Sequence, residues 1–125
     1  TRRKFLEALI IEVKKRSKYC SPYRFHSGFS PIFFPIFVKT EKLRCTKRVF
    51  ASALQAEGID LLDHYGCLVS TWRWAESYFA HAPQTPNAID TRDQVFHLFL
   101  NERYGDRELA DIIAAIEKVE RHFGK

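Results

Sequence analysis

The segment from Gly105 to Phe123 constrains the fold most, because its apolar residues follow the spacing of an α-helix. They form one stripe: Leu109, Ile112, Ile113, Ile116, Val119 and Phe123. Glu108 stands three residues after Gly105, which is typical of a capping box at a helix N-terminus. A helix with a single apolar stripe is stable only when another layer covers that stripe. The chain must therefore fold into at least two packed layers.

The length and composition indicate one globular domain. The chain has 125 residues, of which 46% are hydrophobic and 28% are charged. This is enough for one core and too little for two comfortable domains. The first residue is Thr1, and the chain contains no methionine. We therefore expect it to be a processed or excised piece of a longer polypeptide.

The cysteines and the apolar runs indicate in which cellular compartment the protein is expected. Cys20, Cys45 and Cys67 stand far apart, with no CxxC pair. This favours small packed side chains in a reducing compartment over a disulfide framework or a zinc site. No apolar run approaches the ~18 residues that a membrane span needs, and no signal peptide is visible. We expect a cytoplasmic protein that holds no metal and contacts no membrane.

The other elements are expected in the order helix, strand, helix, short strand, loop, strand, before the closing helix. We expect helices at residues 2–18 and 44–57, strands at 32–39, 59–62 and 95–100, and loops at 19–31 and 66–94. The second loop should include short helices around residues 72–79 and 88–93. This order predicts an α+β fold: a small sheet of two or three mainly antiparallel strands with helices packed against it, preceded by a long amphipathic helix.

Two residues add local detail to these elements. Pro35 lies inside the strand 32–39, and proline has no N–H for the ladder, so we expect an edge strand or a bulge. Gly58 follows the helix 44–57 and suits the left-handed backbone that ends many helices. The side chains expected to face inward from that helix are Cys45, Val49, Phe50, Ala53 and Leu54.

Basic residues crowd the first segment of the chain. The formal net charge is +5 and the pI is about 9.2. The first helix carries Arg2, Arg3, Lys4, Lys14, Lys15, Arg16 and Lys18. Such a face can bind a polyanion, but on a helix of this kind the usual explanation is a solvated surface.

Familiar catalytic motifs are absent from the sequence. It contains no GxGxxG, P-loop, HExxH or GxSxG motif, and its five histidines fall at no metal-ligand spacing. His97 lies in an apolar strand pattern, which favours a satisfied core or edge residue over a ligand. His122 near a helix C-terminus is explained by the helix dipole. We therefore expect no complete catalytic centre and no metal site in this chain.

His64 and Tyr65 are the first candidate site residues. They follow the short strand 59–62, with Asp63 before them and Gly66 after them. A histidine and a phenol where a strand ends in a loop can bind a carboxylate, a sugar hydroxyl or a phosphate, and loops on rigid scaffolds often hold sites. The alternative is that Tyr65 packs while His64 only caps the loop.

Trp72 and Trp74, on either side of Arg73, are the second candidate. The two indoles could stack on nucleobases or sugar rings, or hold a cation over a ring. The alternative, which we favour, is that both indoles pack across a short helix or a subunit contact.

The order of these segments resembles the C-terminal part of the DegT/StrS-type sugar-nucleotide aminotransferases. Gly58–Ile59 and then His64–Tyr65 resemble that family's glycine–isoleucine and histidine–tyrosine signature. The same order continues through almost the whole chain in Phe34–Pro35–Ile36, Thr85–Pro86–Asn87, Val95–Phe96–His97–Leu98 and the closing helix 105–123. These enzymes use pyridoxal 5'-phosphate and have the aspartate-aminotransferase fold.

The resemblance implies that residues 1–18 are a helix linking this piece to a large domain, and that residues 19–125 are the small C-terminal domain. The parent enzyme would pass the amino group of glutamate to a nucleotide-linked keto-sugar in amino-deoxy-sugar or polysaccharide biosynthesis. Its large domain would hold the cofactor and supply the lysine. This segment alone would have no catalytic residue and no activity.

Under this resemblance His64, with Tyr65 beside it, matches the position from which the small domain reaches the substrate, a positioning role. The expected partners are the large domain of the same polypeptide, the nucleotide sugar, the amino donor and a second copy in a homodimer. Two alternatives remain: a free-standing basic module that binds nucleic acid, which we do not favour, and a structural dimerisation domain.

Overall fold

The computed structural model describes residues 1–26, 28, 31–79, 81 and 85–125. The helices in this part are α1 (Arg2–Arg16), α2 (Lys47–Ala56), α3 (Pro86–Gln94) and α4 (Asp106–Phe123). The strands are β1 (Cys20–Pro22), β2 (Phe33–Val38), β3 (Leu61–Leu62) and β4 (Val95–Phe99). Three short 3₁₀ helices complete the order: η1 (Thr40–Lys42), η2 (Val69–Thr71) and η3 (Arg73–Tyr78).

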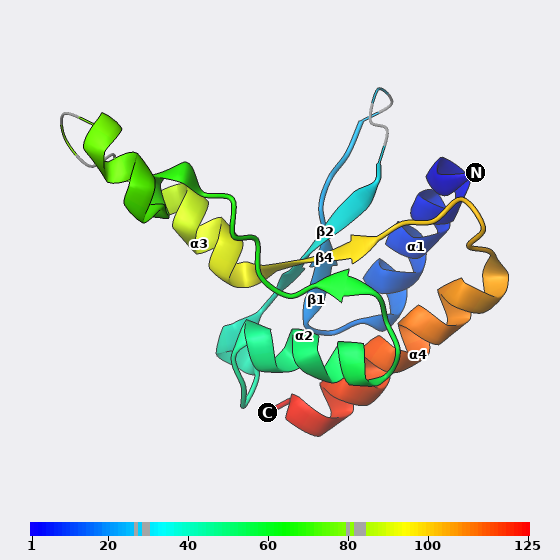
Figure 1. The fold of residues 1–125 in the computed structure, drawn as a ribbon. Helices are drawn as coiled ribbons and strands as arrows, with labels where there is room; N and C mark the ends of the chain where they lie inside the picture. The colour runs from blue at the N-terminus through cyan, green and yellow to red at the C-terminus, as the bar shows by residue number, and fades with distance from the viewer. Residues whose placement is uncertain (27, 29–30, 80, 82–84) are drawn as a thin grey trace.

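The four strands form one antiparallel sheet in the order β1-β2-β4-β3 (Figure 1). The predicted α+β fold class is therefore confirmed. The sheet has one strand more than the upper limit of the prediction, because β1 lies inside the stretch 19–31 that was expected to be a loop. Three residues are too few to show a periodic pattern, and β1 forms because Cys20 to Pro22 pair with Val38 to Ile36.

The prediction that Pro35 lies on an edge strand or in a bulge is wrong, because β2 lies between β1 and β4. The carbonyl oxygen of Pro35 accepts a hydrogen bond from the backbone N–H of Tyr23, at 3.2 Å. The nitrogen of a strand residue faces the same neighbour as its carbonyl. The nitrogen of Pro35, which carries no hydrogen, therefore faces the chain just beyond Pro22, after the last paired residue of β1. The hydrogen bonds between β2 and β4 are not affected.

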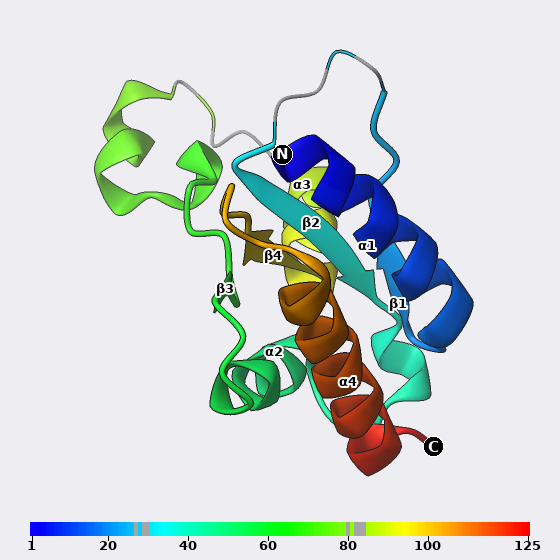
Figure 2. The same ribbon diagram turned by 90° about the vertical axis from the view of Figure 1, so that its right-hand side faces the viewer.

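The two faces of the sheet differ in how they are covered. In Figure 2, α1 and α4 lie in front of the sheet and α3 lies behind it. The core between the front helices and the sheet contains the fully buried side chains Leu6, Leu9, Phe34, Ile36, Phe50, Phe96, Leu98, Ile113 and Ile116. On the opposite face Phe33 and Phe99, which pair across β2 and β4, remain 37% and 41% exposed. The sheet thus has one closed face and one that is only partly covered.

Helix ends follow the local sequence signals in most places. Gly58 has φ 90° after α2, as predicted for a helix stop. α2 begins at Lys47 rather than Arg44, because the hydroxyl of Thr46 caps it by accepting from the N–H of Val49 at 3.3 Å. Val49, predicted to face inward, is 48% exposed. The expected helix around 72–79 is the 3₁₀ helix η3.

Cys45 also departs from its prediction, since it precedes α2 and is only partly buried against the core. Among the residues described, none of the helices has the length and apolarity that a bilayer crossing requires.

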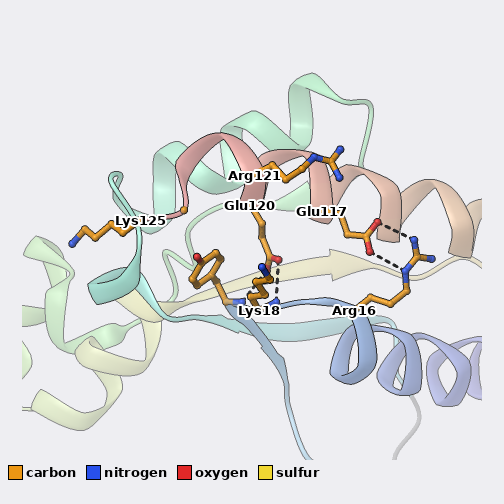
Figure 3. A pocket seen from close by; sticks show the side chains of 8 residues that line it. Arg16, Lys18, Glu117, Glu120, Arg121 and Lys125 are labelled. Atoms are coloured by element: carbon orange, nitrogen blue, oxygen red, sulfur yellow. Dashed lines mark hydrogen bonds and ion pairs between the residues drawn. The ribbon is translucent and has the colours of Figure 1, made fainter.

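The carboxylate of Glu120 on α4 fastens the turn between α1 and β1 (Figure 3). It accepts hydrogen bonds from the backbone N–H groups of Lys18 and Tyr19 at 3.0 Å and of Cys20 at 3.3 Å, and from the hydroxyl of Ser17. Glu120 is 5% exposed. A buried carboxylate is tolerated only when its oxygens are well satisfied. The carboxylate of Glu120 thus holds α4 to the turn that follows α1.

Figure 3 also shows Arg16 and Glu117 joined by two parallel bonds, Nε–Oε1 at 2.9 Å and Nη2–Oε2 at 2.8 Å. Both residues line a pocket of about 430 Å³ between the ends of α1 and α4. Its two carboxylates, those of Glu117 and Glu120, are paired within the fold. None of the predicted site residues lies there, so we assign this pocket a structural role.

Candidate substrate-binding site

His64 and Tyr65 come directly after β3 and Asp63, yet they line two different pockets. The His64 pocket, of about 440 Å³, is lined by Thr40, Cys45, Thr46, Lys47, Arg48, His64 and Asp93. The His97 pocket, of about 390 Å³, is lined by Tyr65, Leu68, Asn87, Ala88, Thr91, Arg92, Val95 and His97. Both lie at the end of the sheet where β3, α2 and α3 meet.

Lys47 is a buried cation at the start of α2. Its side chain is only 3% exposed, and its Nζ donates to the backbone carbonyl of Asp63. Burial lowers the pKa of Lys47, and the carboxylates of Asp63 and Asp93 partly oppose this shift. Arg48 contacts the Asp63 carboxylate through Nε at 3.4 Å. The segment before His64 is thus held to α2 by both residues.

His64 lies within the electrostatic reach of this buried cation. Burial lowers the pKa of His64, and Lys47, Arg92 and Arg48 lower it further. The imidazole is therefore neutral near pH 7, with one nitrogen that donates and one that accepts. Its Nδ1 is buried and has no hydrogen-bond partner in the described part of the chain. A neutral imidazole that lines a pocket is suited to binding a hydroxyl or a phosphate.

His97 on β4 is the second imidazole of this region. It is 8% exposed and lies against two rings, Phe33 at 5.2 Å and Tyr65 at 5.5 Å between centroids. Burial and the charge of Lys47 lower its pKa. The sequence predicts a satisfied core or edge residue; His97 is buried, but its Nδ1 has no partner among the described residues.

Trp72 and Trp74 line neither of these pockets. Their rings lie 5.4 Å apart, and Trp74 also meets Tyr78 edge-on at 6.2 Å. The indole N–H of Trp72 donates to the carbonyl of Gly66 at 2.9 Å, so this ring is anchored. Trp74 and Tyr78 are 65% and 80% exposed. Figure 1 shows their segment projecting away from the sheet beside α3.

Sequence reasoning did not identify Lys47, Arg92 or His97 as site residues. Lys47 resembles any other cation of a basic helix, and its burial arises only when residue 63 folds back over it. Arg92 lies on α3 with its side chain 18% exposed and its Nε bonded to Asp93 at 2.9 Å. His97 carried a usable signal, since a histidine that alternates with buried apolar residues points to the opposite face of the sheet.

We expect acid to destabilise the protein through His64 and His97. Because their pKa values are lowered in the folded state, the unfolded chain, with histidine pKa about 6.5, binds more protons just below that pH. Stability should therefore fall as pH drops from about 7 toward about 5, above the range where carboxylates mostly titrate.

Urea unfolding at these two pH values measures the effect. The double variant His64→Asn/His97→Asn should lose less stability on acidification than the wild type. An equal loss in both proteins would contradict the assignment.

Comparison with known proteins bears on the fold alone. No protein-family model matches the chain, and no curated protein matches it in sequence. Among solved structures, the chain is similar to an aminotransferase, TlmJ from Streptoalloteichus hindustanus, with a TM-score of 0.74 and 14% sequence identity. This chain has the fold of part of an aminotransferase. The match covers 97% of the chain but 31% of TlmJ, so the chain spans less than a third of that protein's length.

Among the residues described, no group of three or more His, Cys, Asp and Glu side chains could hold a metal ion.

Proposed function

We propose that this chain is the small domain of a pyridoxal phosphate-dependent aminotransferase of the DegT/StrS type. The single observation that carries the proposal is the similarity of nearly the whole chain to part of an aminotransferase structure. The sequence supports it independently, because the order of segments around Gly58–Ile59 and His64–Tyr65 resembles that family. A fold by itself does not define a function, so the activity has to be tested on the longer polypeptide.

The partly covered face of the sheet supports a further domain in the same polypeptide. Phe33 and Phe99 are exposed on that face, at 37% and 41%. Neighbouring apolar side chains of this size mark a surface that another protein layer covers. We assign that layer to the large domain. In this proposal residues 1–18 form the linking helix and residues 19–125 the small domain.

In this proposal the chain does not bind pyridoxal phosphate on its own. Such a site needs an accessible lysine, a phosphate cradle and an acidic partner for the ring nitrogen. Lys47 is the one lysine in the described ranges that lies in the core, and its amine is committed to the Asp63 carbonyl. The proposal therefore places the cofactor and its lysine in the large domain, and the isolated chain should be inactive.

The contribution of this chain is to orient the substrate through His64. The His64 pocket combines a neutral imidazole with Arg48 and with the N-terminus of α2 at Thr46. Helix N-termini and basic side chains favour phosphate groups. A nucleotide-linked keto-sugar offers both phosphates and hydroxyls, which supports this substrate class; glutamate is the proposed amino donor.

Replacement of His64 by Asn in the longer polypeptide should lower kcat/KM for the keto-sugar by about 10- to 100-fold, because loss of a positioning contact misaligns the reacting groups. Cofactor content should not change. His122→Asn on α4, which lines a different pocket, is the matched control and should retain full activity. Unchanged kcat/KM in the His64 variant would remove this residue from the substrate site.

The exposed rings of Trp74 and Tyr78 favour a contact with a second copy of the protein, the homodimer expected from the sequence. Large exposed aromatic side chains are enriched in such interfaces. Sedimentation of the Trp74→Ala variant should show a lower dimer fraction than the wild type. A dimer that is equally stable in both proteins would leave these rings without an interface role.

A further inference from the structure

The His97 pocket is distinct from the His64 pocket in which the proposed substrate contact lies. Its wall contains His97, which is more than nine-tenths buried and has an Nδ1 with no hydrogen-bond partner among the described residues. Buried polar atoms without partners are rare in native proteins. The imidazole is also fixed in place, because Phe33 and Tyr65 lie against it at 5.2 and 5.5 Å. A buried residue that lines a pocket and has an unpartnered polar atom is a place where a further group can bind.

The charge around this pocket is positive. Arg92 is the one arginine or lysine among the described residues that line it, and the buried Lys47 adds a positive potential that reaches His97. Arg92 uses its Nε for the carboxylate of Asp93 at 2.9 Å. A guanidinium has five N–H donors in a planar fork, so its terminal nitrogens keep donors for a second oxyanion. Arg92 is held in place on α3 with its side chain only 18% exposed.

We propose that the His97 pocket binds a small oxyanion, a carboxylate or phosphate group, between the Arg92 guanidinium and the His97 imidazole. Charge-assisted pairing with the arginine fork provides the affinity. The neutral imidazole and the hydroxyl of Tyr65 provide hydrogen bonds that discriminate oxyanions from halide ions. A volume of about 390 Å³ is of the size of small-molecule sites. Every residue that this inference uses belongs to this chain, so the site can be tested without measuring the proposed aminotransferase activity.

The test is an NMR titration of the protein at low salt with inorganic phosphate and, separately, with succinate. We expect saturable binding of at least one of them, with shifts confined to the backbone amides of residues 65, 91, 92 and 97. Binding of only phosphate, or of only succinate, would identify the class of oxyanion that the pocket takes. No saturable binding of either, or shifts centred on the pocket between α1 and α4, would overturn the proposal.

Variants locate the interaction on the two named side chains. Arg92→Gln and His97→Gln should each weaken binding by about tenfold or more, the effect of losing one charge-assisted or buried hydrogen bond. Arg92→Lys keeps the charge without the fork and should fall between wild type and Arg92→Gln. The control Arg103→Gln removes an exposed arginine outside the pocket and should bind as the wild type. If Arg103→Gln weakened binding as much as Arg92→Gln, the anion would be attracted by overall charge. That result would overturn the proposed site.

Discussion

Replacement of Glu120 by Ala should destabilise the protein by about 3 kcal/mol, because a buried carboxylate loses several hydrogen bonds at once. The carboxylate accepts from three consecutive backbone N–H groups, those of residues 18, 19 and 20, and from the hydroxyl of Ser17. Without it, the N–H groups of Lys18 and Tyr19 lose these hydrogen bonds, while the N–H of Cys20 keeps the hydroxyl of Ser17 as a partner, at 2.8 Å. Since the net stability of a domain is about 5–15 kcal/mol, this single change should remove a large part of it. Urea unfolding at neutral pH measures the difference.

Glu117→Ala is the matched control for Glu120→Ala. Glu117 lies on the same helix and pairs with Arg16 through two bonds, but both side chains are partly exposed, at 28% and 41%. Exposed ion pairs contribute about 0–1 kcal/mol, so this variant should unfold near the wild-type midpoint. If the two variants lost the same stability, the hydrogen bonds of Glu120 would contribute no more than an exposed ion pair. The proposed role of Glu120 in holding α4 to the start of β1 would then be wrong.

Replacement of Phe96 by Ala should cost about 3–5 kcal/mol, the range for deleting a buried aromatic side chain. Phe96 is 0% exposed and packs at 6.4 Å from Phe50 of α2. The cavity would open between the sheet and the helices that cover its closed face. Calorimetry and urea unfolding should both show the loss, with little change in secondary structure at low temperature.

Phe99→Ala on the same strand is the comparison that tests the register. Phe99 faces the opposite side of the sheet and is 41% exposed, so its loss should cost no more than about 1 kcal/mol. A larger cost at position 99 than at position 96 would mean that β4 is turned over relative to the register described here.

The elements with strong local signals were predicted from the sequence. The stripe of α4 and the stop at Gly58 depend on residues close in the chain, and both are found as expected. β1 and the interior place of Pro35 depend on which strands become neighbours, a long-range choice that local patterns do not record. The exposure of Val49 has the same origin: the helix 44–57 starts later than predicted, at a cap that Thr46 provides.

The candidate site was predicted only in part. His64 and Tyr65 were selected because they follow a strand, and each lines a pocket. The pairing of each with a buried group could not be predicted from the sequence: Lys47 of α2 acts on His64, and His97 of β4 lies against Tyr65. Both relations arise from the order β2-β4-β3 and the position of α2, so they follow from the tertiary structure.

The central claim, that this chain is the small domain of an aminotransferase, is tested most directly on the longer polypeptide that contains it. Purified from cells, that protein should show the visible absorbance of bound pyridoxal phosphate, and glutamate should bleach it, while the 125-residue chain alone should show no such absorbance. A longer polypeptide without this absorbance, or one whose absorbance no amino donor changes, would contradict the claim.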